Sequence, residues 1–330
     1  MSVPLLHLRN VSRRYPMRRG LLGRTVDVRA VDGVSLTVER GRTLGLVGES
    51  GSGKSTTGRL ALGLEAPDAG DVLFQGAPLP PPDSREWRRL RSRMQMIYQD
   101  PLGALDRRLP IMEQTREPFD VHGLGEPKDR DAMALALLQS VGLRADQGRR
   151  YPHELSGGQR QRAVVARALA TKPDLLVCDE PVSALDVSIQ AQLINLFVDL
   201  QHEFDLSLLF ISHDLKVIRQ VSHRVAVMYL GRIVEEGEAD LLLQAPAHPY
   251  TQALVSAAPM PGRRSRPRIV LEGDPPNPAA RPSGCAFHPR CPAARARCRV
   301  ESPALLPLPD GRRAACHVAH DEPRLLKAAG

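Results

Sequence analysis

The sequence of 330 residues has few aromatic side chains, few lysines and no long apolar run. Phe, Trp and Tyr make up 4% of it, and only five of the 45 basic residues are lysine. A helix that crosses a membrane needs roughly 18 apolar residues in a row, and no stretch of this chain approaches that length. The N-terminus also lacks the basic start and long apolar core of a signal peptide. We therefore expect a protein that spans no membrane and stays in the cytoplasm.

The positive charge is concentrated at the C-terminal end. The formal net charge is +8, and residues 261–330 hold 13 Lys and Arg against 6 Asp and Glu, which leaves little net charge elsewhere. A basic segment can bind nucleic acid or anionic lipid, but few aromatic rings are present to stack on bases. We favour an arginine-rich composition, or weak attraction to a membrane surface, over nucleic-acid binding.

The strongest chemical signal is a glycine-rich loop. The apolar run 43–47 predicts a buried strand, and residues 57–62 can begin a helix. A GxxxxGK[ST] pattern lies between them, and its residues are Gly48, Glu49, Ser50, Gly51, Ser52, Gly53, Lys54, Ser55 and Thr56. Such a loop turns backbone N–H groups toward a phosphate at the positive end of a helix. We expect Lys54 to reach the β- and γ-phosphates of a nucleotide and Ser55 to ligate Mg²⁺.

A second predicted strand, over residues 175–178, ends in the carboxylates Asp179 and Glu180. An Asp at this position can hold Mg²⁺ directly or through water, and the next carboxylate can orient or deprotonate an attacking water. Acidic residues are common at strand ends, so the pair gains its meaning only beside the phosphate loop. We assign Asp179 to the metal and Glu180 to the water.

A second segment of the chain is also predicted to begin a helix whose N-terminus can bind a phosphate. Its residues are Ser156, Gly157, Gly158 and Gln159. Ser156 is a good N-cap, and residues 160–170 continue as a predicted helix. One γ-phosphate hardly needs two such loops from a single subunit. The economical arrangement is a head-to-tail pair of ATPase domains, in which each supplies this loop to the nucleotide of the other.

Strands and helices alternate in the prediction after residue 174, which is typical of an α/β protein with a mostly parallel sheet. Earlier strands are expected over 5–11, 31–39, 70–74 and 94–98, with a basic surface loop over 16–24 and a helical insert over 102–150. Beyond residue 260 lie 12 of the 29 prolines and four of the five cysteines. We therefore predict a boundary near 260, between a domain of residues 1–260 and an extension of residues 261–330.

Taken in order, these motifs resemble those of ATP-binding-cassette (ABC) ATPases. Residues 48–56 resemble the Walker A loop, 175–179 the Walker B strand, 155–159 the signature and 183–186 the D-loop, which contains Asp186. Gln99 resembles the Q-loop glutamine, His213 the switch histidine and Tyr15 the aromatic residue that stacks on adenine. The resemblance implies a P-loop NTPase fold with a parallel core, an antiparallel β subdomain and a helical subdomain at about residues 100–170. It also implies ATP and Mg²⁺ as cofactors, with Gln99 at the metal or the lytic water and His213 donating to the γ-phosphate.

Four further stretches, 98–102, 151–154, 180–192 and 248–251, resemble the branch of di- and oligopeptide importers, which includes nickel and glutathione importers. The branch implies an ATPase attached peripherally to the cytoplasmic face of the cell membrane, with two integral-membrane permease subunits. It further implies a second ATPase, either a sibling or another copy, indirectly a solute-binding protein, and no specific nucleic acid. Residues 105–108 depart from the Asn-Pro-Arg expected there. The alternative, a soluble ABC ATPase acting on DNA or ribosomes, usually needs two cassettes or a long coiled coil, and the sequence contains neither.

Four cysteines lie in the proline-rich tail, spaced C-x5-C-x6-C-x17-C, at Cys285, Cys291, Cys298 and Cys316. Disulfides are rare in the cytoplasm, whereas four thiolates suit zinc or an iron–sulfur cluster. The spacing lacks the close pair of common zinc sites. The peptide-importer branch carries a similar tail, and the resemblance implies a [4Fe–4S] cluster in some members, while zinc and no metal remain open. His288 and His317 are spare candidate ligands, and Cys178 is interpreted as a small apolar residue of a strand.

Overall fold

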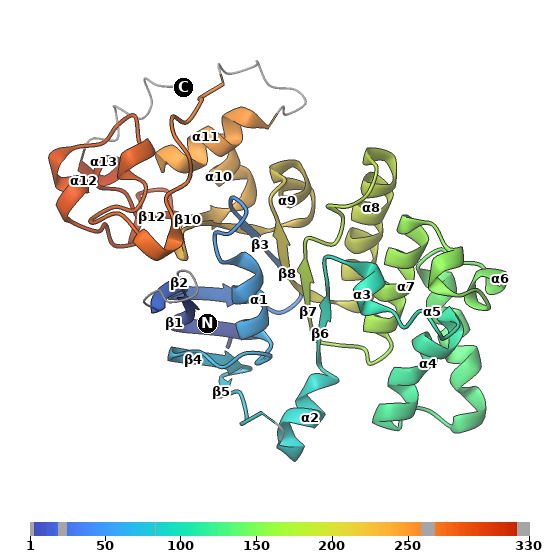
Figure 1. Cartoon of the computed structure of the whole chain (residues 1–330). Helices are drawn as coiled ribbons and strands as arrows, with labels where there is room; N and C mark the ends of the chain where they lie inside the picture. The colour runs from blue at the N-terminus through green and yellow to red at the C-terminus, as the bar shows by residue number, and fades with distance from the viewer. Residues whose placement is uncertain (1–2, 19–24, 83, 259–267, 322–330) are drawn as a thin grey trace.

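The structure, a computed structural model, describes residues 3–18, 25–82, 84–258 and 268–321. Two sheets form its centre, a group of helices extends to one side of them, and the C-terminal segment packs against the other side (Figure 1). The boundary predicted near residue 260 falls within 259–267, outside the described residues.

The larger sheet has, among the described residues, eight strands in the order β11-β12-β10-β9-β3-β8-β7-β6. The parallel strands are β6 (Met94–Ile97), β7 (Leu175–Asp179), β8 (Ser207–Ser212), β3 (Thr43–Val47) and β9 (Arg224–Tyr229). The strands β10 (Arg232–Glu238), β12 (Arg313–Ala314) and β11 (Leu306–Pro307) continue the sheet in antiparallel pairing. Every residue of β3, β7 and β8 is buried, as expected when both faces of a parallel sheet are covered. The predicted mostly parallel core is confirmed.

Alternate residues of each central strand enter different cores. Leu175 and Val177 pack with the antiparallel sheet and α1 (Lys54–Ala61), whereas Leu176 and Cys178 pack with the helices of the opposite face. Those helices are α7 (Gly157–Leu169), α8 (Val187–Phe204), α9 (Leu215–Val221), α10 (Ala239–Gln244) and α11 (Pro249–Ala257). Cys178 is fully buried in this apolar layer, which agrees with its interpretation as a small apolar residue.

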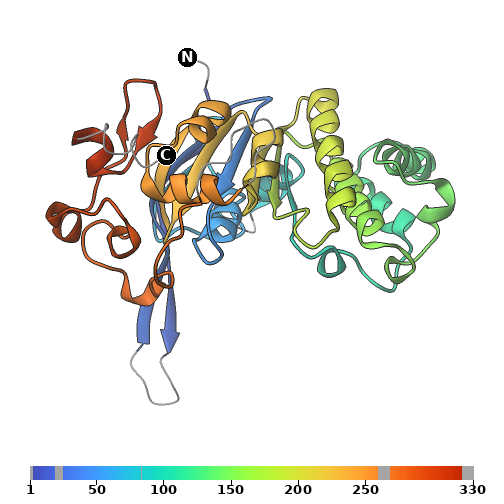
Figure 2. The same ribbon diagram turned by 90° about the horizontal axis from the view of Figure 1, so that it is seen from above.

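The smaller sheet is antiparallel and has the order β2-β1-β4-β5. Its strands are β1 (Leu6–Arg18), β2 (Thr25–Val38), β4 (Ala69–Phe74) and β5 (Ala77–Pro78). The arms of β1 and β2 extend away from the body as a hairpin (Figure 2). The predicted surface loop over 16–24 is therefore wrong at residues 16–18, which pair with 25–27, and residues 19–24 lie outside the described ranges. Pro16 is tolerated there because β4 pairs with β1 only as far as Ser12.

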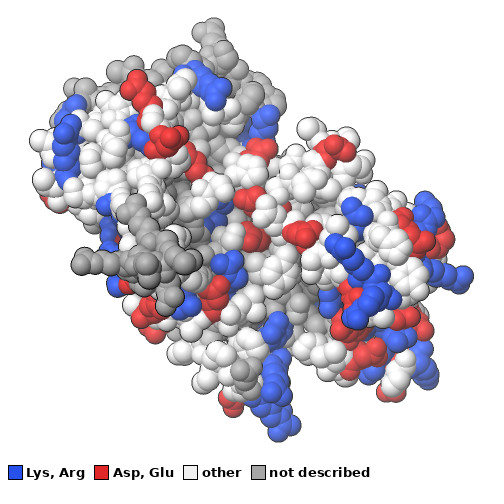
Figure 3. All heavy atoms as spheres, in the orientation of Figure 1, with Lys and Arg blue, Asp and Glu red and all other residues white. Residues whose placement is uncertain are grey.

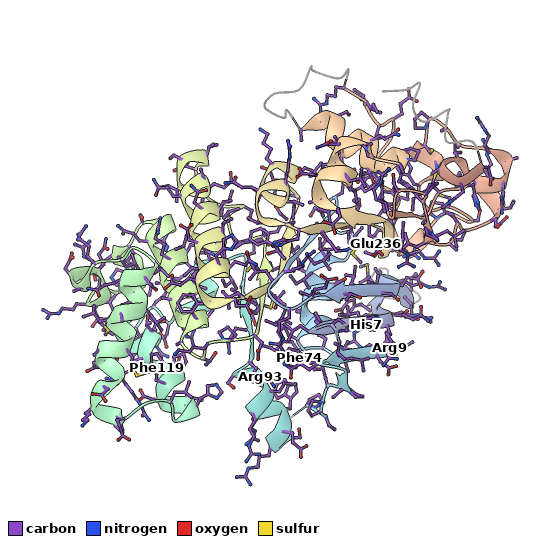
Figure 4. The ribbon with its side chains drawn as sticks, turned by 180° about the vertical axis from the view of Figure 1, so that it is seen from behind. His7, Arg9, Phe74, Arg93, Phe119 and Glu236 are labelled. Carbon is purple, nitrogen blue, oxygen red and sulfur yellow. The ribbon has the colours of Figure 1, made fainter. Side chains whose placement is uncertain are left out.

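The helical group lies beyond the β6 edge of the larger sheet. It contains α3 (Pro101–Ala104), α4 (Ile111–His122), α5 (Arg130–Ser140), α6 (Ala145–Gly148) and α7, with short 3-10 turns at Pro127–Asp129 and Pro152–Glu154. A separate helix, α2 (Arg85–Arg91), precedes β6, and the Arg93 guanidinium then lies 5.2 Å from the centre of the Phe74 ring on β4 (Figure 4). No helix in the described ranges is long and apolar enough to cross a bilayer.

The C-terminal segment, residues 268–321, is joined to the larger sheet. It holds 3-10 turns at Pro278–Ala280 and His288–Arg290, α12 (Ala296–Val300), α13 (His317–Asp321) and the strands β11 and β12. The strand β12 pairs with β10, where Glu235 lies opposite Ala314. A buried ion pair, Arg312 Nη1 to Glu235 Oε1 at 3.2 Å, lies beside this pairing. The segment thus completes one edge of the sheet that carries the motifs.

Candidate active site

The predicted site residues follow neighbouring parallel strands. Val47 of β3 lies opposite Ser212 of β8, and Asp179 of β7 lies opposite Ile211 of β8. Because parallel strands end at a common edge, the loops after β3, β6, β7 and β8 open side by side there. These loops carry Lys54 and Ser55, Gln99, Glu180 and His213.

The glycine loop turns tightly before α1. A Cβ atom on Gly48 would lie 2.2 Å from the carbonyl oxygen of Met228, and one on Gly53 would lie 2.1 Å from that of Ala30. Gly53 also has a φ of +106°, in the region that favours glycine. A side chain at either position would therefore displace the loop from the strands beside it.

Lys54 is buried at the first position of α1, with 4% of its surface exposed. Its Nζ donates to the carbonyl oxygens of Gly48 and Glu49, both at 2.9 Å, and lies 3.9 Å from Glu180 Oε1. Burial lowers the pKa of Lys54, while the carboxylates of Glu180, Asp179 and Glu49 act in the opposite direction. The ammonium group thus lies inside the phosphate loop, bonded to two of the loop's own carbonyl groups. A bound phosphate would replace these carbonyl oxygens as its partners.

Ser55 and Asp179 bring two oxygen ligands together. The Ser55 hydroxyl donates to Asp179 Oδ1 at 3.0 Å, across 124 positions of sequence. Burial raises the pKa of Asp179, and the hydrogen bond from Ser55 opposes that rise. A hydroxyl and a carboxylate at the end of a buried strand are hard oxygen donors of the kind that Mg²⁺ prefers, so the residues present fit this ion.

Glu180 is the point where three predicted residues meet. His213 Nδ1 lies 3.1 Å from its Oε2, and Gln99 Nε2 donates to the same oxygen at 3.3 Å. Its backbone φ is +47°, unusual for a residue with a side chain, and its N–H donates to Ile211 O at 3.0 Å. A strained residue held in this way is typical of a functional position. Together with Lys54, these contacts bring all four predicted catalytic residues into one place.

The second predicted phosphate-binding segment, residues 156–159, lies at the start of α7. Ser156 and Gln159 form a capping box at the start of α7, with Gln159 N donating to Ser156 Oγ at 3.3 Å and Ser156 N donating to Gln159 Oε1 at 3.0 Å. Among the described hydrogen bonds and ion pairs, none joins residues 156–159 or Asp186 to the phosphate loop. Ser156 and Asp186 are exposed at the surface of the single chain.

Among the described contacts, Tyr15 is linked to the phosphate loop through other side chains. Its hydroxyl donates to Glu65, which is bonded to Arg59, and Arg59 Nη2 donates to Thr56 Oγ1 at 3.2 Å. The Arg13 guanidinium lies 5.2 Å from the centre of the Tyr15 ring. The stacking of this ring on adenine remains a prediction.

The expectation of metal at the tail cysteines gains no support. All five cysteines are free, and burial raises the pKa of Cys291 to about 12 and that of Cys316 to about 11, with neighbouring thiols adding to the rise. Within the described ranges, no group of three or more His, Cys, Asp or Glu is arranged to hold a metal ion. In each spare ligand one ring nitrogen is bonded to a backbone carbonyl, His288 Nδ1 to Cys285 O and His317 Nε2 to Glu301 O. The residues as arranged do not fit an iron–sulfur cluster or zinc.

Sequence reasoning missed two residues that contact the phosphate loop. Tyr250 and Arg290 both bond to Glu49. Tyr250 belongs to the stretch 248–251, which was noted as a resemblance without a role. Arg290 is one of 13 basic residues in an arginine-rich tail, and no local pattern distinguishes it from the others.

A buried lysine in a glycine loop, a hydroxyl–carboxylate pair and a glutamate in contact with lysine, glutamine and histidine side chains define a P-loop nucleotide hydrolase. Residues 31–183 match the family model for the ABC transporter, and residues 234–298 match that for the oligopeptide/dipeptide transporter C-terminal region.

Full-length relatives agree with these matches. The chain is 51% identical to a probable peptide ABC transporter ATP-binding protein, y4tS, of Sinorhizobium fredii, over 96% of this chain and 91% of the relative. It is 47% identical to the oligopeptide transport ATP-binding protein AppF of Bacillus subtilis, over 95% and 97% of the two chains. The dipeptide transport ATP-binding protein DppF of Haemophilus influenzae is 45% identical over 96% and 97%.

Among solved structures, the ATP-binding cassette MJ0796, a dimer bound to ADP and Pi, matches with a TM-score of 0.63 and 27% identity over 71% of this chain and 98% of that one. The chain therefore belongs to the ABC transporter family, among the ATP-binding proteins of its peptide-transporter branch. The predicted family, fold class and ATPase activity are confirmed.

Proposed function

We propose that this chain binds and hydrolyses ATP to energise the uptake of di- or oligopeptides, or of related small solutes, through a membrane permease. The observation that carries the proposal is the convergence of Lys54, Gln99 and His213 on Glu180 at the edge of the sheet. Relatives named as peptide transport ATP-binding proteins support the class of solute.

The chain's own residues divide the chemistry among them. Lys54 exchanges its two backbone carbonyl partners for the β- and γ-phosphates, and Glu180 orients a water molecule and accepts its proton. His213 donates to the γ-phosphate, while the neutral amide of Gln99 holds Glu180 or the water in place. Ser55 and Asp179 would hold Mg²⁺, which supplies positive charge that neutralises the phosphate oxygens.

Residues 156–159 and Asp186 act in a second cassette. Ser156 and Asp186 are exposed on one chain, and none of the described hydrogen bonds or ion pairs joins this set to its own phosphate loop, so a head-to-tail dimer supplies them to the partner's nucleotide. The related cassette MJ0796 is dimeric. The second cassette is either a sibling ATPase or another copy of this chain.

The helical group, residues 100–170, contacts two integral-membrane permease subunits and transmits the closing and opening of the dimer. We place the protein peripherally at the cytoplasmic face of the cell membrane, with a solute-binding protein acting on the far side. We also retain the division into residues 1–260 and an extension of residues 261–330.

The alternative, action on DNA or ribosomes, is not favoured by any relative reported above. On the face drawn in Figure 3, positive and negative side chains are interspersed over the helical group rather than gathered into one positive surface. Co-purification from solubilised membranes tests the proposal: recovery with permease subunits supports it, and recovery with ribosomes or DNA overturns it.

Uptake provides the second test. Cells that carry Lys54→Met should lose uptake of a labelled dipeptide or oligopeptide that wild-type cells import. Lys172→Met, at an exposed residue between α7 and β7, should not change uptake. Uptake that survives Lys54→Met would contradict the proposal.

Neither the [4Fe–4S] cluster that the resemblance implies nor the zinc that four thiolates could hold is given a role, because the cysteines do not assemble a metal site among the described residues. Analysis of anaerobically purified protein for iron, zinc and acid-labile sulfide tests this point. Equal amounts of iron and sulfide would establish a cluster that the arrangement of the thiols does not indicate.

A further inference from the structure

Glu49, the second residue of the phosphate loop, is held from the C-terminal segment. Arg290 Nη1 lies 3.0 Å from Glu49 Oε2 and 3.3 Å from Oε1, and Nη2 lies 3.3 Å from Oε1. The two residues are 241 positions apart, and the Arg290 side chain is only 8% exposed. The Glu49 side chain is 28% exposed, so the pair is partly buried. A multiply bonded guanidinium–carboxylate pair of this kind restricts both side chains more than a single exposed contact does.

The anchor of Arg290 is rigid. Arg290 ends the 3-10 turn His288–Arg290, and its N–H donates to Phe287 O at 3.0 Å. The Phe287 ring is buried, with its centre 5.3 Å from that of Tyr229, 5.5 Å from that of Tyr250 and 5.6 Å from that of His248. Aromatic packing of this kind fixes the position of the turn relative to the body of the cassette.

The backbone of Glu49 is held as well. Its N–H donates to the hydroxyl oxygen of Tyr250 at 2.9 Å, and its carbonyl oxygen accepts from Lys54 Nζ at 2.9 Å. Tyr250 is fully buried on α11, and burial raises its pKa, so the phenol stays neutral. The side chain and the N–H of this one loop residue are thus bonded to two parts of the chain outside the loop, at Arg290 and Tyr250.

We propose that Arg290 is a positioning residue of the ATP site, through which the C-terminal segment sets the affinity of the phosphate loop for nucleotide. The inference rests on the proposed function and goes beyond it, because it assigns the extension a part in nucleotide binding. A loop that is already ordered binds phosphate without a further loss of conformational freedom. Without Arg290, the carboxylate of Glu49 loses the guanidinium that holds it, while the backbone N–H stays bonded to Tyr250. The nucleotide must then supply more of the ordering of the loop.

The test is a titration of the full-length subunit with Mg·ATP by calorimetry. Arg290→Ala should raise Kd by about 5- to 20-fold, because part of the binding energy is then used to order the loop. Arg290→Lys, which keeps the charge but not the two-nitrogen geometry, should restore part of the affinity. In the assembled transporter, KM for ATP should rise with little change in kcat, since Arg290 acts on binding rather than on the reacting atoms.

Arg313→Ala is the matched control. Arg313 is also a tail arginine that pairs with a carboxylate of the cassette, with Nη1 2.9 Å from Glu236 Oε1 on β10 (Figure 4), but its ion pair does not include the phosphate loop. Its substitution should leave Kd unchanged. The inference would be overturned if wild type and Arg290→Ala bound Mg·ATP with the same Kd. It would also be overturned if Arg313→Ala raised Kd as much as Arg290→Ala does.

If Arg290→Ala does not fold, Glu49→Gln tests the same contact from the side of the loop. It should raise Kd by about 3- to 10-fold in a thermally stable protein, and unchanged affinity in that variant would also overturn the inference. Failure of the wild-type protein to bind Mg·ATP would instead remove the proposed function. The two failures are therefore distinguishable.

Discussion

The edge of the parallel strands and the C-terminal segment both concentrate reactive side chains, but they are built differently. At the edge, the register of β3, β7 and β8 brings together loops that lie far apart in the sequence. In the segment, the helices and strands between residues 268 and 321 are at most five residues long. Its cysteines lie near one another without forming a metal site within the described ranges.

The difference shows what regular structure contributes to a site. A parallel sheet fixes the position of every strand end, so residues placed there meet without individual anchors. An irregular segment is positioned by particular side chains, here by the burial of Phe287 and by the pairs that Arg290 and Arg312 form with the cassette. Substitutions at the edge should therefore change the rate of ATP hydrolysis. Substitutions in the C-terminal segment should instead change the free energy of unfolding or the affinity for nucleotide.

The largest effect is expected from Glu180→Gln. Hydrolysis should fall by about 10²- to 10⁴-fold, because the amide cannot accept a proton from water, while binding of Mg·ATP should persist. Phosphate release by the assembled transporter measures the loss, and size-exclusion chromatography with Mg·ATP should show a stable dimer. Glu203→Gln, at an exposed position of α8, is the control and should retain full activity. Turnover that survives in Glu180→Gln would remove Glu180 from its role.

Arg312→Ala should produce the largest loss of stability in the C-terminal segment. It leaves the carboxylate of Glu235, which is fully buried, without its ionic partner, although the N–H groups of Ala247 and His248 still donate to it. Removing one member of a buried pair costs about 3 kcal/mol or more. Urea unfolding of the full chain measures this change.

Arg297→Ala is the control for Arg312→Ala, because Arg297 pairs with Glu301 and Asp321 at the surface of the same segment. Exposed pairs contribute little, so its unfolding midpoint should stay near that of the wild type. Equal effects of the two substitutions would mean that burial of the Arg312 pair does not hold the segment in place.

A smaller effect concerns His248 and pH. Burial lowers its pKa from 6.5 to about 3, and its Nδ1 accepts from Tyr250 N at 3.0 Å at the start of α11. Between these two pKa values the unfolded chain binds more protons, so the free energy of unfolding falls as the pH drops through 6.5. From about pH 7 to about pH 5 this one group should cost about 2 kcal/mol.

His248→Asn removes the titrating group but keeps a side chain that can cap α11. Urea unfolding at the two pH values should therefore show a smaller acid-induced loss in the variant than in the wild type. An identical loss in both proteins would show that other groups cause the acid sensitivity.

Local signals in the sequence predicted most of the catalytic edge. The strand over 43–47 has the predicted bounds, because its apolar residues and the glycine that follows them mark it directly. Glu180 and Lys54 were predicted from motifs that follow predicted strands, whereas Gln99 and His213 were predicted from the resemblance to ABC ATPases. The long arms of β1 and β2 were not predicted, since Pro16 and the basic run after it are typical of a loop.

The sequence by itself determined the family, the parallel core and the residues that meet at Glu180, because these depend on contiguous patterns. Only the tertiary structure decided that β12 closes the edge of the sheet, that Arg290 holds Glu49 and that His288 and His317 bond to backbone carbonyls. Such contacts join residues up to 241 positions apart. They depend on how irregular segments pack against a finished sheet, and no short stretch of sequence records that packing.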